Sequence, residues 1–351
     1  MRRSENKYMM NRIGSSGRRD FLRMMGLGAT ALALSNTGLG AVTAAKPLRG
    51  LFPIGFTPFT PDDKIDLDGL AAQVKFCNRG SVHGFMWPQN ASGWSTMSEK
   101  ERLDGAGAIL SSGKGGKTAL VIGVQGSDLD TVTRYAQHAE KLGADAIVSL
   151  PPTGVSDEKA ILAYYQKVGS ITSLPFFAQA VGNMSVDLLV EMFKTIPTFR
   201  YVKDEAGNPL ERVAELRERT GDQLKVFSGG GASTMILEME RGFSGACPYV
   251  DLADVFASAF DLWHEGKKRE AFDMFGRIQA FASITPVSSV DIMIARGVFK
   301  PGTKLRTAAP AAGGRGSGAG SASGARARGI QLSIEEIRKE LDAYLKPYLK
   351  A

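Results

Sequence analysis

Lys203 is the residue of this sequence with the clearest potential for covalent chemistry. It ends the short run 199–203, and the polar, turn-like segment 204–208 follows directly. A lysine amine can condense with a ketone when its surroundings hold it neutral, and desolvation favours the neutral form. The simpler interpretation is a solvated lysine at the end of a strand. The elements that position this side chain decide between the two interpretations.

Strand-like apolar runs alternate with segments of helical period eight times along the chain. The expected strands are residues 51–57, 82–87, 118–124, 144–150, 174–178, 199–203, 224–228 and 244–247. Helical patterns lie between them, for example at 67–77 and 129–142. Ser98 and Glu101 have the spacing of a capping box at the start of another helix.

This alternation predicts an α/β fold, a (β/α)8 TIM barrel, because right-handed crossovers place each helix outside a parallel sheet. An open doubly wound sheet is the alternative. That fold requires a glycine fingerprint after the first strand, and residues 55–59 do not supply one. Pro58 and Pro61 also disfavour a helix that starts with free amides at this point. In the barrel, Lys203 ends strand six, at the end where barrel enzymes keep their active sites.

The C-terminal part of the sequence predicts a helical extension. Helical patterns cover 251–265 and 268–281 and continue to Arg296. Residues 307–329 are almost all Ala, Gly, Ser and Arg, a composition that predicts a disordered insert. Ser333 is then expected to cap a last amphipathic helix that ends near residue 349.

The first 45 residues have the pattern of an export signal. Arg18 and Arg19 belong to a twin-arginine pattern, a modestly apolar stretch follows at 24–39, and small residues at 42–45 offer cleavage sites. We expect a periplasmic or secreted protein with no membrane attachment after cleavage; an ordinary basic arm is the alternative. The expected parts of the chain are a twin-arginine signal peptide at 1–45, a barrel at 48–265 and a C-terminal helical region at 266–351.

Charge and cysteine content argue against several classes of function. The whole chain has 43 Lys and Arg and 36 Asp and Glu residues; without residues 1–45 these become 36 and 34, a net charge of +2. A nearly neutral protein offers no electrostatic basis for nucleic-acid binding. Cys77 and Cys247 lie in apolar runs, which favours two buried free thiols over a disulfide. The three histidines are not spaced as metal ligands, and we expect no metal or cofactor.

With a lysine at the end of strand six and a helical extension, the chain resembles the dihydrodipicolinate synthase/N-acetylneuraminate lyase family. The likeness covers 51 to about 306 and the last helix, and its most specific stretch is Tyr-Val-Lys-Asp-Glu-Ala-Gly-Asn at 201–208. Further matching stretches are 53–70, 138–146, 225–229 and 242–245. The resemblance implies class I aldolase chemistry, in which Lys203 forms a Schiff base with a 2-oxo acid, and it implies a homotetramer.

The sequence departs from this family around the lysine. The family's carboxylate-binding loop after strand two corresponds to Asn90, Ala91 and Ser92, without its two threonines. Ala178 or Gln179 replaces the strand-five tyrosine, and a threonine and a glycine replace the tyrosine pair after strand four. The tyrosine relay of a lysine-biosynthetic synthase therefore cannot be assembled from these positions. This, together with export, argues against dihydrodipicolinate synthesis.

Two groups of residues are expected at the site. The candidate catalytic residues are Lys203, Gln179 and Tyr201, and the candidate substrate-binding residues are Asn90, Ala91, Ser92, Gly229 and Cys247. If Lys203 points into the barrel, Tyr201 shares its side one layer deeper, and buried packing is the alternative role for that ring. Gln179 can orient a water molecule but does not titrate. Asp204 and Glu205 are nearby acids.

Three hypotheses for function follow. The first is an exported Schiff-base lyase, an aldolase or hydro-lyase, that acts through Lys203 on a 2-oxo acid such as pyruvate or a keto-deoxy sugar acid. The second is a non-catalytic binding protein that keeps the barrel and has lost the proton relay. The third is a barrel enzyme with other chemistry, such as hydrolysis driven by Asp204 or Glu205. We favour the first.

Overall fold

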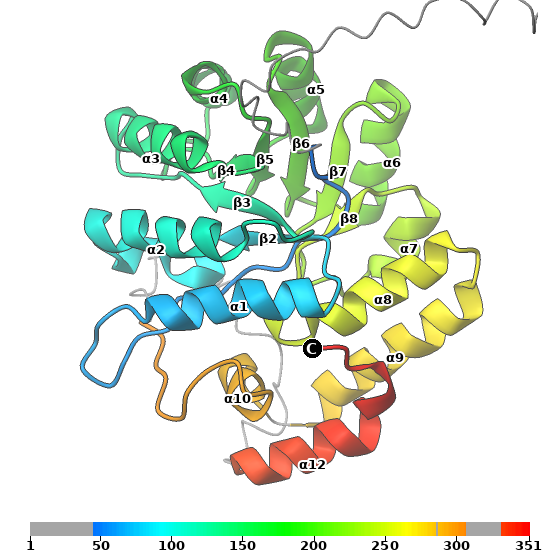
Figure 1. Ribbon diagram of the computed structural model, residues 1–351. Helices are drawn as coiled ribbons and strands as arrows, with labels where there is room; N and C mark the ends of the chain where they lie inside the picture. Colours follow the sequence, from blue (N-terminus) through cyan, green and yellow to red (C-terminus); the bar gives the residue numbers. More distant parts are fainter. Residues whose placement is uncertain (1–44, 286, 307–330) are drawn as a thin grey trace, which may run out of the picture. The chain divides into compact units, whose positions relative to one another are not determined.

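The computed structural model describes residues 45–285, 287–306 and 331–351. In this part of the chain eight parallel strands alternate with helices, and further helices follow the barrel (Figure 1). The predicted (β/α)8 TIM barrel with a C-terminal helical extension is confirmed. The predicted insert at 307–329 lies outside the described residues, as do residues 1–44 of the predicted signal peptide.

One sheet contains all eight strands of the described residues, and its neighbouring strands are parallel in the order β1-β8-β7-β6-β5-β4-β3-β2. The strands are β1 Gly50–Leu51, β2 Gly84–Trp87, β3 Ala119–Gly123, β4 Ala146–Ser149, β5 Phe176–Ala180, β6 Phe199–Asp204, β7 Lys225–Ser228 and β8 Gly245–Ala246. From β2 onward they lie within two residues of the predicted bounds. The apolar sequences of most of these strands fit strands that are covered on both faces, and β6, with the sequence Phe-Arg-Tyr-Val-Lys-Asp, is the exception.

The first strand is the main departure from the predicted elements. The sequence predicts strand over 51–57, whereas β1 is only two residues long. Pro53 lacks the amide hydrogen that a continuous ladder requires. The chain still joins β2, because the Met86 amide donates to the Pro53 carbonyl at 2.9 Å and the Gly55 amide donates to the Met86 carbonyl at 3.0 Å. These bonds close the barrel between the first and second strands.

A helix follows each strand on the outside of the barrel (Figure 1). The helices are α1 Leu67–Arg79, α2 Glu99–Ser112, α3 Leu129–Leu142, α4 Glu158–Ile171, α5 Val186–Thr195, α6 Pro209–Thr220, α7 Met235–Glu240 and α8 Ala253–His264. The predicted capping box starts α2, since the amides of Ser98 and Glu101 each donate to the other residue's side chain. Helix α7 starts later than predicted because Ala232 has a φ of 61°, outside the helical region.

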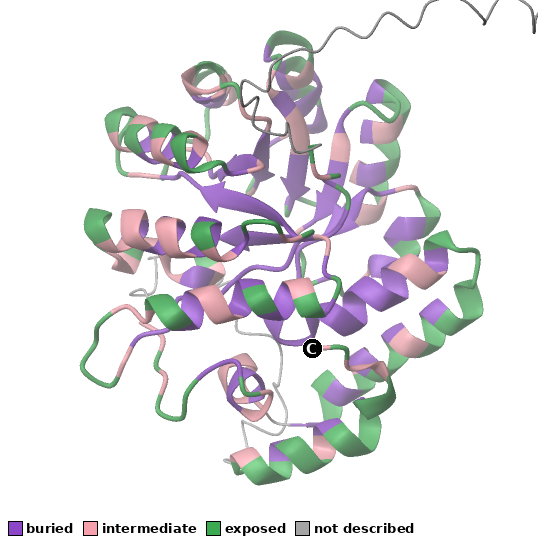
Figure 2. Ribbon diagram, viewed as in Figure 1, coloured by how far each residue is buried: buried purple, intermediate pink, exposed green. Residues whose placement is uncertain are grey.

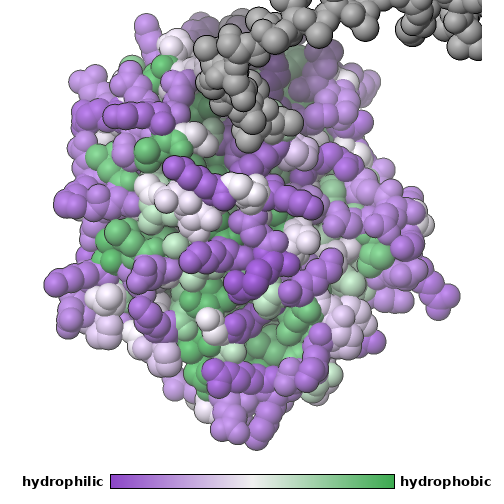
Figure 3. Space-filling view, in the orientation of Figure 1, coloured by the Kyte–Doolittle hydropathy of each residue, from purple (hydrophilic) through white to green (hydrophobic). Residues whose placement is uncertain are grey.

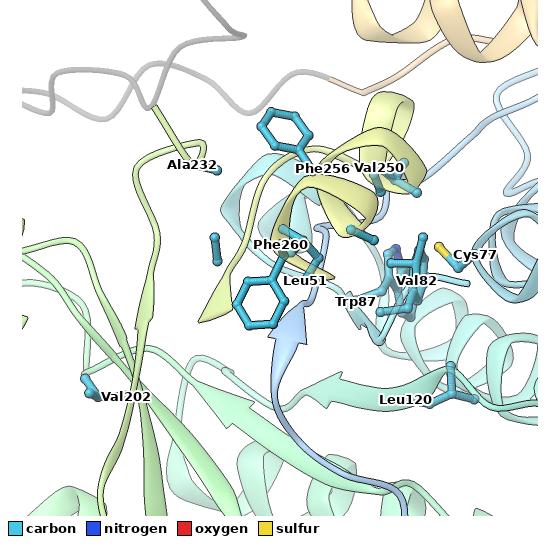
Figure 4. Packing of buried hydrophobic residues seen from close by; sticks show 14 of the residues in the cluster. Leu51, Cys77, Val82, Trp87, Leu120, Val202, Ala232, Val250, Phe256 and Phe260 are labelled. Atoms are coloured by element: carbon cyan, nitrogen blue, oxygen red, sulfur yellow. The ribbon is translucent and has the colours of Figure 1, made fainter. Parts of the chain in front are cut away.

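The apolar core has two layers. One fills the barrel interior and includes Phe52, Val121, Phe177 and Phe227. The other lies between the strands and the surrounding helices and includes Val202 (Figure 4). The strands are buried almost throughout, whereas the helices alternate buried and exposed residues (Figure 2). Because side chains alternate between the faces of a strand, the outward direction of Val202 turns its two neighbours in β6 inward.

Three further helices follow the barrel within the described residues: α9 Lys268–Ile284, α10 Ser289–Ala295 and α12 Ile334–Tyr344, with the 3-10 turn η4 Lys346–Tyr348 after them. Ser333 caps α12 as predicted, and its hydroxyl oxygen accepts from the amide of Glu336. This helix ends before the predicted residue 349, because Pro347 has no amide hydrogen to continue its bonding pattern, and the chain goes on as η4.

A buried ion pair joins the extension to the barrel. The guanidinium of Arg296 contacts both carboxylate oxygens of Asp254 on α8, at 2.8 and 2.7 Å. The amides of Lys350 and Ala351 donate to one of these oxygens at 2.8 and 3.2 Å. Both charged side chains are almost fully buried. Asp254 therefore binds helix α8 to the end of α10 and to the C-terminal residues.

The two cysteines are free and buried, as the sequence predicts. Burial raises the pKa of the Cys77 thiol far above its ordinary value.

On the face of the molecule seen in Figure 3, hydrophilic residues predominate and hydrophobic ones lie between them. Over the described residues no single helix has the length and hydropathy of a membrane span; one pair, α9 and α10, passes that test together with a bend of 110°.

Candidate active site

A cavity of about 620 Å³ opens at the carboxyl-terminal ends of the strands. This volume is in the range of small-molecule binding sites. Six of the predicted site residues line it: Lys203, Gln179, Asn90, Ala91, Gly229 and Cys247. Tyr201 and Ser92 are not among its lining residues. The structure thus brings together, around one cavity, residues that come from β5, β6 and the loops after β2, β7 and β8.

Lys203 faces this cavity and forms an ion pair inside it. Its side chain is only 5% exposed, and its Nζ lies 2.8 Å from Oε1 of Glu205, a side chain that is 24% exposed. The amide of Glu205 still donates to the carbonyl of Ala180 on β5, so the strand pairing continues past the last residue of β6. Residues two apart in a strand face the same side, which is why both side chains reach the cavity.

Gln179 lies directly beside Lys203 in the sheet, because the two residues are register partners on β5 and β6. Its Nε2 donates to Oε2 of Glu205 at 2.6 Å. Its Oε1 is buried and has no hydrogen-bond partner among the described residues. A buried acceptor without a donor is costly. Gln179 thus holds the Glu205 carboxylate through Nε2, while its own Oε1 stays buried without a partner among the described residues.

Gly229 makes room for the carboxylate. A Cβ at this position would overlap Cγ of Glu205. The amide of Gly229 donates to the Asp204 carbonyl at 3.1 Å, which fixes the loop after β7 against the end of β6. Glycine is required here by the close approach of a side chain rather than by a special backbone angle.

The loop after β2 divides its predicted residues between two roles. Asn90 and Ala91 line the cavity. The hydroxyl of Ser92 donates to the Gly55 carbonyl and accepts from the Gln89 amide, and the side chain is buried. The Ser92 hydroxyl therefore holds the loop against the first strand segment. Gln89 also lines the cavity, and its buried Oε1 has no partner among the described residues.

Tyr201 lies inside the barrel one layer below Lys203, as strand alternation predicts. Its ring stacks on Phe177 with centroids 4.5 Å apart and meets Phe227 edge-on at 6.3 Å. Burial raises the pKa of its hydroxyl. The contacts that the structure gives this ring are packing contacts, and no hydrogen bond joins it to Lys203 among the described contacts.

Two further titratable groups line the cavity from the chain after β8. Burial raises the pKa of the Cys247 thiol to about 12, although Lys203 opposes the shift, so the thiol stays protonated at neutral pH. The Tyr249 ring packs against Phe56 with centroids 5.5 Å apart. Burial raises the pKa of the Tyr249 hydroxyl, and the carboxylates of Asp251 and Glu205 raise it further.

Asp204 points away from the amine and is held in an ion pair. Its carboxylate accepts from the Arg212 guanidinium at 2.8 and 3.1 Å and from the Ala206 amide at 3.1 Å. Burial raises the pKa of Asp204, and Arg212 partly offsets this. These contacts fix the turn after β6. Among the residues that the structure describes, no group of His, Cys, Asp and Glu is arranged to hold a metal ion.

Sequence reasoning underestimated Glu205. It stands in the sequence only as a nearby acid, whereas it contacts both Lys203 and Gln179. Its position two residues after Lys203 was the available signal, because alternation would turn both inward if the strand continued. No sequence pattern indicated that Gln89 and Tyr249 line the cavity, because the course of the loops after β2 and β8 places them there.

The fold and the site define a class: a parallel (β/α)8 barrel whose cavity holds a buried lysine at the end of the sixth strand. The model of the dihydrodipicolinate synthetase family matches residues 47–298, most of the chain. The chain belongs to this family.

Curated relatives are distant and carry different names. A 4-hydroxy-tetrahydrodipicolinate synthase of Rhizobium meliloti is 27% identical over 193 residues, which cover 53% of this chain and 65% of that protein. The match therefore spans less than two thirds of that relative. An L-2-keto-3-deoxyarabonate dehydratase of Azospirillum brasilense is 24% identical over 233 residues, 64% of this chain and 75% of that protein.

Solved structures share the fold. A sialic acid aldolase of Ruminococcus gnavus superposes with a TM-score of 0.70 at 17% identity, over 86% of this chain and 99% of that one. A dihydrodipicolinic acid synthase family protein of E. coli K12, in complex with pyruvate, gives a TM-score of 0.67 at 17% identity, over 85% of this chain and 98% of that one. At this identity the likeness concerns the fold alone.

Proposed function

We propose that this protein is an exported Schiff-base lyase, an aldolase or hydro-lyase, that acts on a 2-oxo acid such as pyruvate or a keto-deoxy sugar acid. The observation that carries the proposal is the buried amine of Lys203, which lines a cavity of substrate size at the catalytic end of the barrel. The activities by which two relatives and a structural neighbour are named, those of a synthase, a dehydratase and an aldolase, support the general class.

The chemistry begins when Nζ of Lys203 attacks the ketone carbon of the substrate. Loss of water gives an iminium, which withdraws electrons from the neighbouring carbon. A carbon–carbon bond at that carbon can then break, or a hydroxyl one carbon further can leave. Water finally releases the product and restores the amine. Asn90 and Ala91 lie on the cavity wall where the substrate carboxylate would bind.

Dihydrodipicolinate synthesis is not the reaction that we propose. The departures at Ala178, Gln179 and Ser92 remove the tyrosine and threonines of that relay, and Tyr201 packs among aromatic rings below the amine. Export and the homotetramer implied by the family resemblance remain predictions.

Trapping with borohydride tests the proposal. Purified protein is incubated with pyruvate or with 2-keto-3-deoxy sugar acids, reduced, digested and examined by mass spectrometry. We expect covalent mass on the peptide that contains Lys203, and no adduct in Lys203→Ala. Lys225→Ala, which removes a lysine from the neighbouring strand, should still be trapped. Failure of the unaltered protein to form an adduct across a broad panel of 2-oxo acids would exclude Schiff-base chemistry.

The ion pair itself favours one alternative, a binding protein without turnover. A carboxylate 2.8 Å from Nζ stabilises the ammonium, which is not nucleophilic. That alternative predicts that 2-oxo acids raise the melting temperature without being consumed, and that Lys203→Ala binds them with unchanged affinity. Calorimetry on both proteins distinguishes it from the lyase, for which this variant forms no adduct.

A further inference from the structure

We infer that Glu205 is the acid–base catalyst of this site and takes the place of the tyrosine relay that the sequence lacks. This inference rests on the proposed function and adds to it the group that moves the protons. Its basis is the contact between Oε1 of Glu205 and Nζ of Lys203, at 2.8 Å inside the cavity. General acid–base catalysis requires such a group within hydrogen-bond distance of the reacting atom.

Three features of the structure hold the carboxylate in this position. Gln179 donates to Oε2 at 2.6 Å, so each carboxylate oxygen has a defined partner. The missing side chain of Gly229 leaves the volume that the Glu205 side chain occupies. The Glu205 amide remains paired with Ala180 on β5, which fixes the backbone. A carboxylate held on both oxygens is arranged for proton transfer, whereas a surface ion pair is usually loose.

The other titratable groups in the described lining of the cavity are less suited to this role. They are Asp204, Cys247 and Tyr249. Asp204 is bound to Arg212 and turned away from the amine. Cys247 stays a thiol, and the phenolate of Tyr249 is disfavoured by burial and by nearby carboxylates. Glu205 is the carboxylate that contacts the amine.

The protons balance when Glu205 carries them during Schiff-base formation. The Lys203 ammonium gives one proton to Glu205, and the neutral amine forms a bond to the ketone carbon. Glu205 passes that proton to the former ketone oxygen, takes a second from nitrogen and delivers it to the same oxygen, which leaves as water. Nitrogen keeps one hydrogen in the iminium. The carboxylate ends ionised beside this cation and stabilises it.

The same group then serves the carbon next to the iminium. In an aldol cleavage, Glu205 takes the proton of the hydroxyl on the carbon two positions from the iminium carbon. The O–H electrons form a carbonyl on that carbon as its bond to the carbon next to the iminium breaks. The electrons of the broken bond form the enamine. Glu205 returns the proton to the enamine carbon. With pyruvate alone, the corresponding step removes a methyl proton and returns one from the solvent pool. This makes exchange of the pyruvate methyl hydrogens in D2O a direct measure of the step.

The experiment combines two measurements on the purified full-length protein, with pyruvate as the probe. Borohydride trapping reports the Schiff base, and loss of the pyruvate methyl signal in D2O reports proton transfer at carbon. We expect Glu205→Gln to reach the same extent of trapping more slowly, with methyl exchange reduced by about a hundredfold to ten-thousandfold. Glu205→Asp should recover part of the exchange rate. Glu211→Gln, the same change at an exposed residue of α6, should exchange like the unaltered protein.

The outcomes separate the two proposals. If the unaltered protein is not trapped, the Schiff-base function itself fails. If it is trapped and Glu205→Gln exchanges the methyl hydrogens at the unaltered rate, Glu205 is not the catalyst. Trapping without any exchange in the unaltered protein also contradicts the role at carbon. Melting temperatures of all variants identify any that fail to fold. If Glu205→Gln does not fold, the methyl exchange rate of Glu205→Asp is compared instead, and a rate equal to that of the unaltered protein would count against Glu205 as the catalyst.

Discussion

At the scale of single residues, the site depends on a lysine and a carboxylate that neutralise each other inside a cavity. Removing Glu205 leaves the buried Lys203 side chain without its counterion, which is costly in a protein interior. The carboxylate itself is partly exposed at the cavity and can be reached from it. In the proposed reaction, a 2-oxo acid would bring its own negative carboxylate and a polarised carbonyl to this pair.

Gly229→Ala moves the carboxylate without changing its chemistry. The new Cβ would overlap Glu205 Cγ, so the side chain must leave its contact with Lys203. We expect kcat to fall by about tenfold to a hundredfold, because misplacement of an acid–base group by about 1 Å has effects of this order. Gly276→Ala on α9 adds the same methyl group to open space and should keep full activity. An unchanged kcat in Gly229→Ala would show that the carboxylate position is unimportant.

Glu238 on α7 gives a pH-dependent prediction outside the site. Its side chain is buried, and burial raises its pKa above the ordinary value of 4.5, while hydrogen bonds from Thr234 and Ser228 partly offset this. The folded state therefore binds this proton more tightly than the unfolded state. The stability that protonation contributes is present below 4.5 and is lost as the pH rises through the raised pKa.

We therefore expect Glu238→Gln to raise the free energy of unfolding at about pH 7 and to have a smaller effect at about pH 4, where the natural side chain is itself neutral. Urea denaturation at both pH values measures this. Glu240→Gln, at an exposed position of the same helix, is the control. A variant that is less stable than the natural protein at neutral pH would contradict the argument.

At the scale of elements, the order of strands and helices could be predicted because the sequence repeats one pattern eight times. The starts of α2 and α12 could also be predicted, since Ser98 and Ser333 carry local capping signals. The short first strand follows from Pro53, which has no amide hydrogen. Whether this ends a strand depends on which backbone groups the neighbouring strands pair with, and the sequence does not show that. Glu205 was underestimated because pairing continues past β6, a feature that tertiary context decides.

The link between α8, α10 and the C-terminal residues gives a prediction at this scale. Asp254→Asn leaves the buried guanidinium of Arg296 without its counterion. We expect a loss of about 3–5 kcal/mol in the free energy of unfolding. Asp104→Asn, which breaks an exposed pair with Lys100, should cost less than about 1 kcal/mol. Equal effects of the two substitutions on chemical denaturation would mean that the buried pair is not a structural link.

At the scale of the whole molecule, the sequence and the family relation define the fold, and the chemistry and substrate class of this chain are what we propose. The residues that replace the family's threonines and tyrosines cannot be interpreted by resemblance. Their contacts become visible only when the loops are folded around the cavity, as with the bond from Gln179 to Glu205 and the buried, unpartnered oxygens of Gln89 and Gln179 among the described residues.

Export is a property of the whole chain and can be tested in cells. We expect the natural chain, fused to a reporter that is active only outside the cytoplasm, to give signal in a bacterial host. Replacing both Arg18 and Arg19 with lysine should remove the signal, because the twin-arginine pathway reads that pair. No signal from the natural chain would show that these residues form an ordinary basic arm, and an equal signal from both chains would show that export does not depend on the arginine pair.

A crystal structure after soaking with pyruvate tests the Schiff base at Lys203 without any chemical trapping. We expect continuous electron density from Nζ of Lys203 to the second carbon of pyruvate, with the Glu205 carboxylate still next to the new bond. An intact contact between Lys203 and Glu205 at saturating pyruvate, with the ligand absent from the cavity or bound without a covalent link, would contradict this expectation.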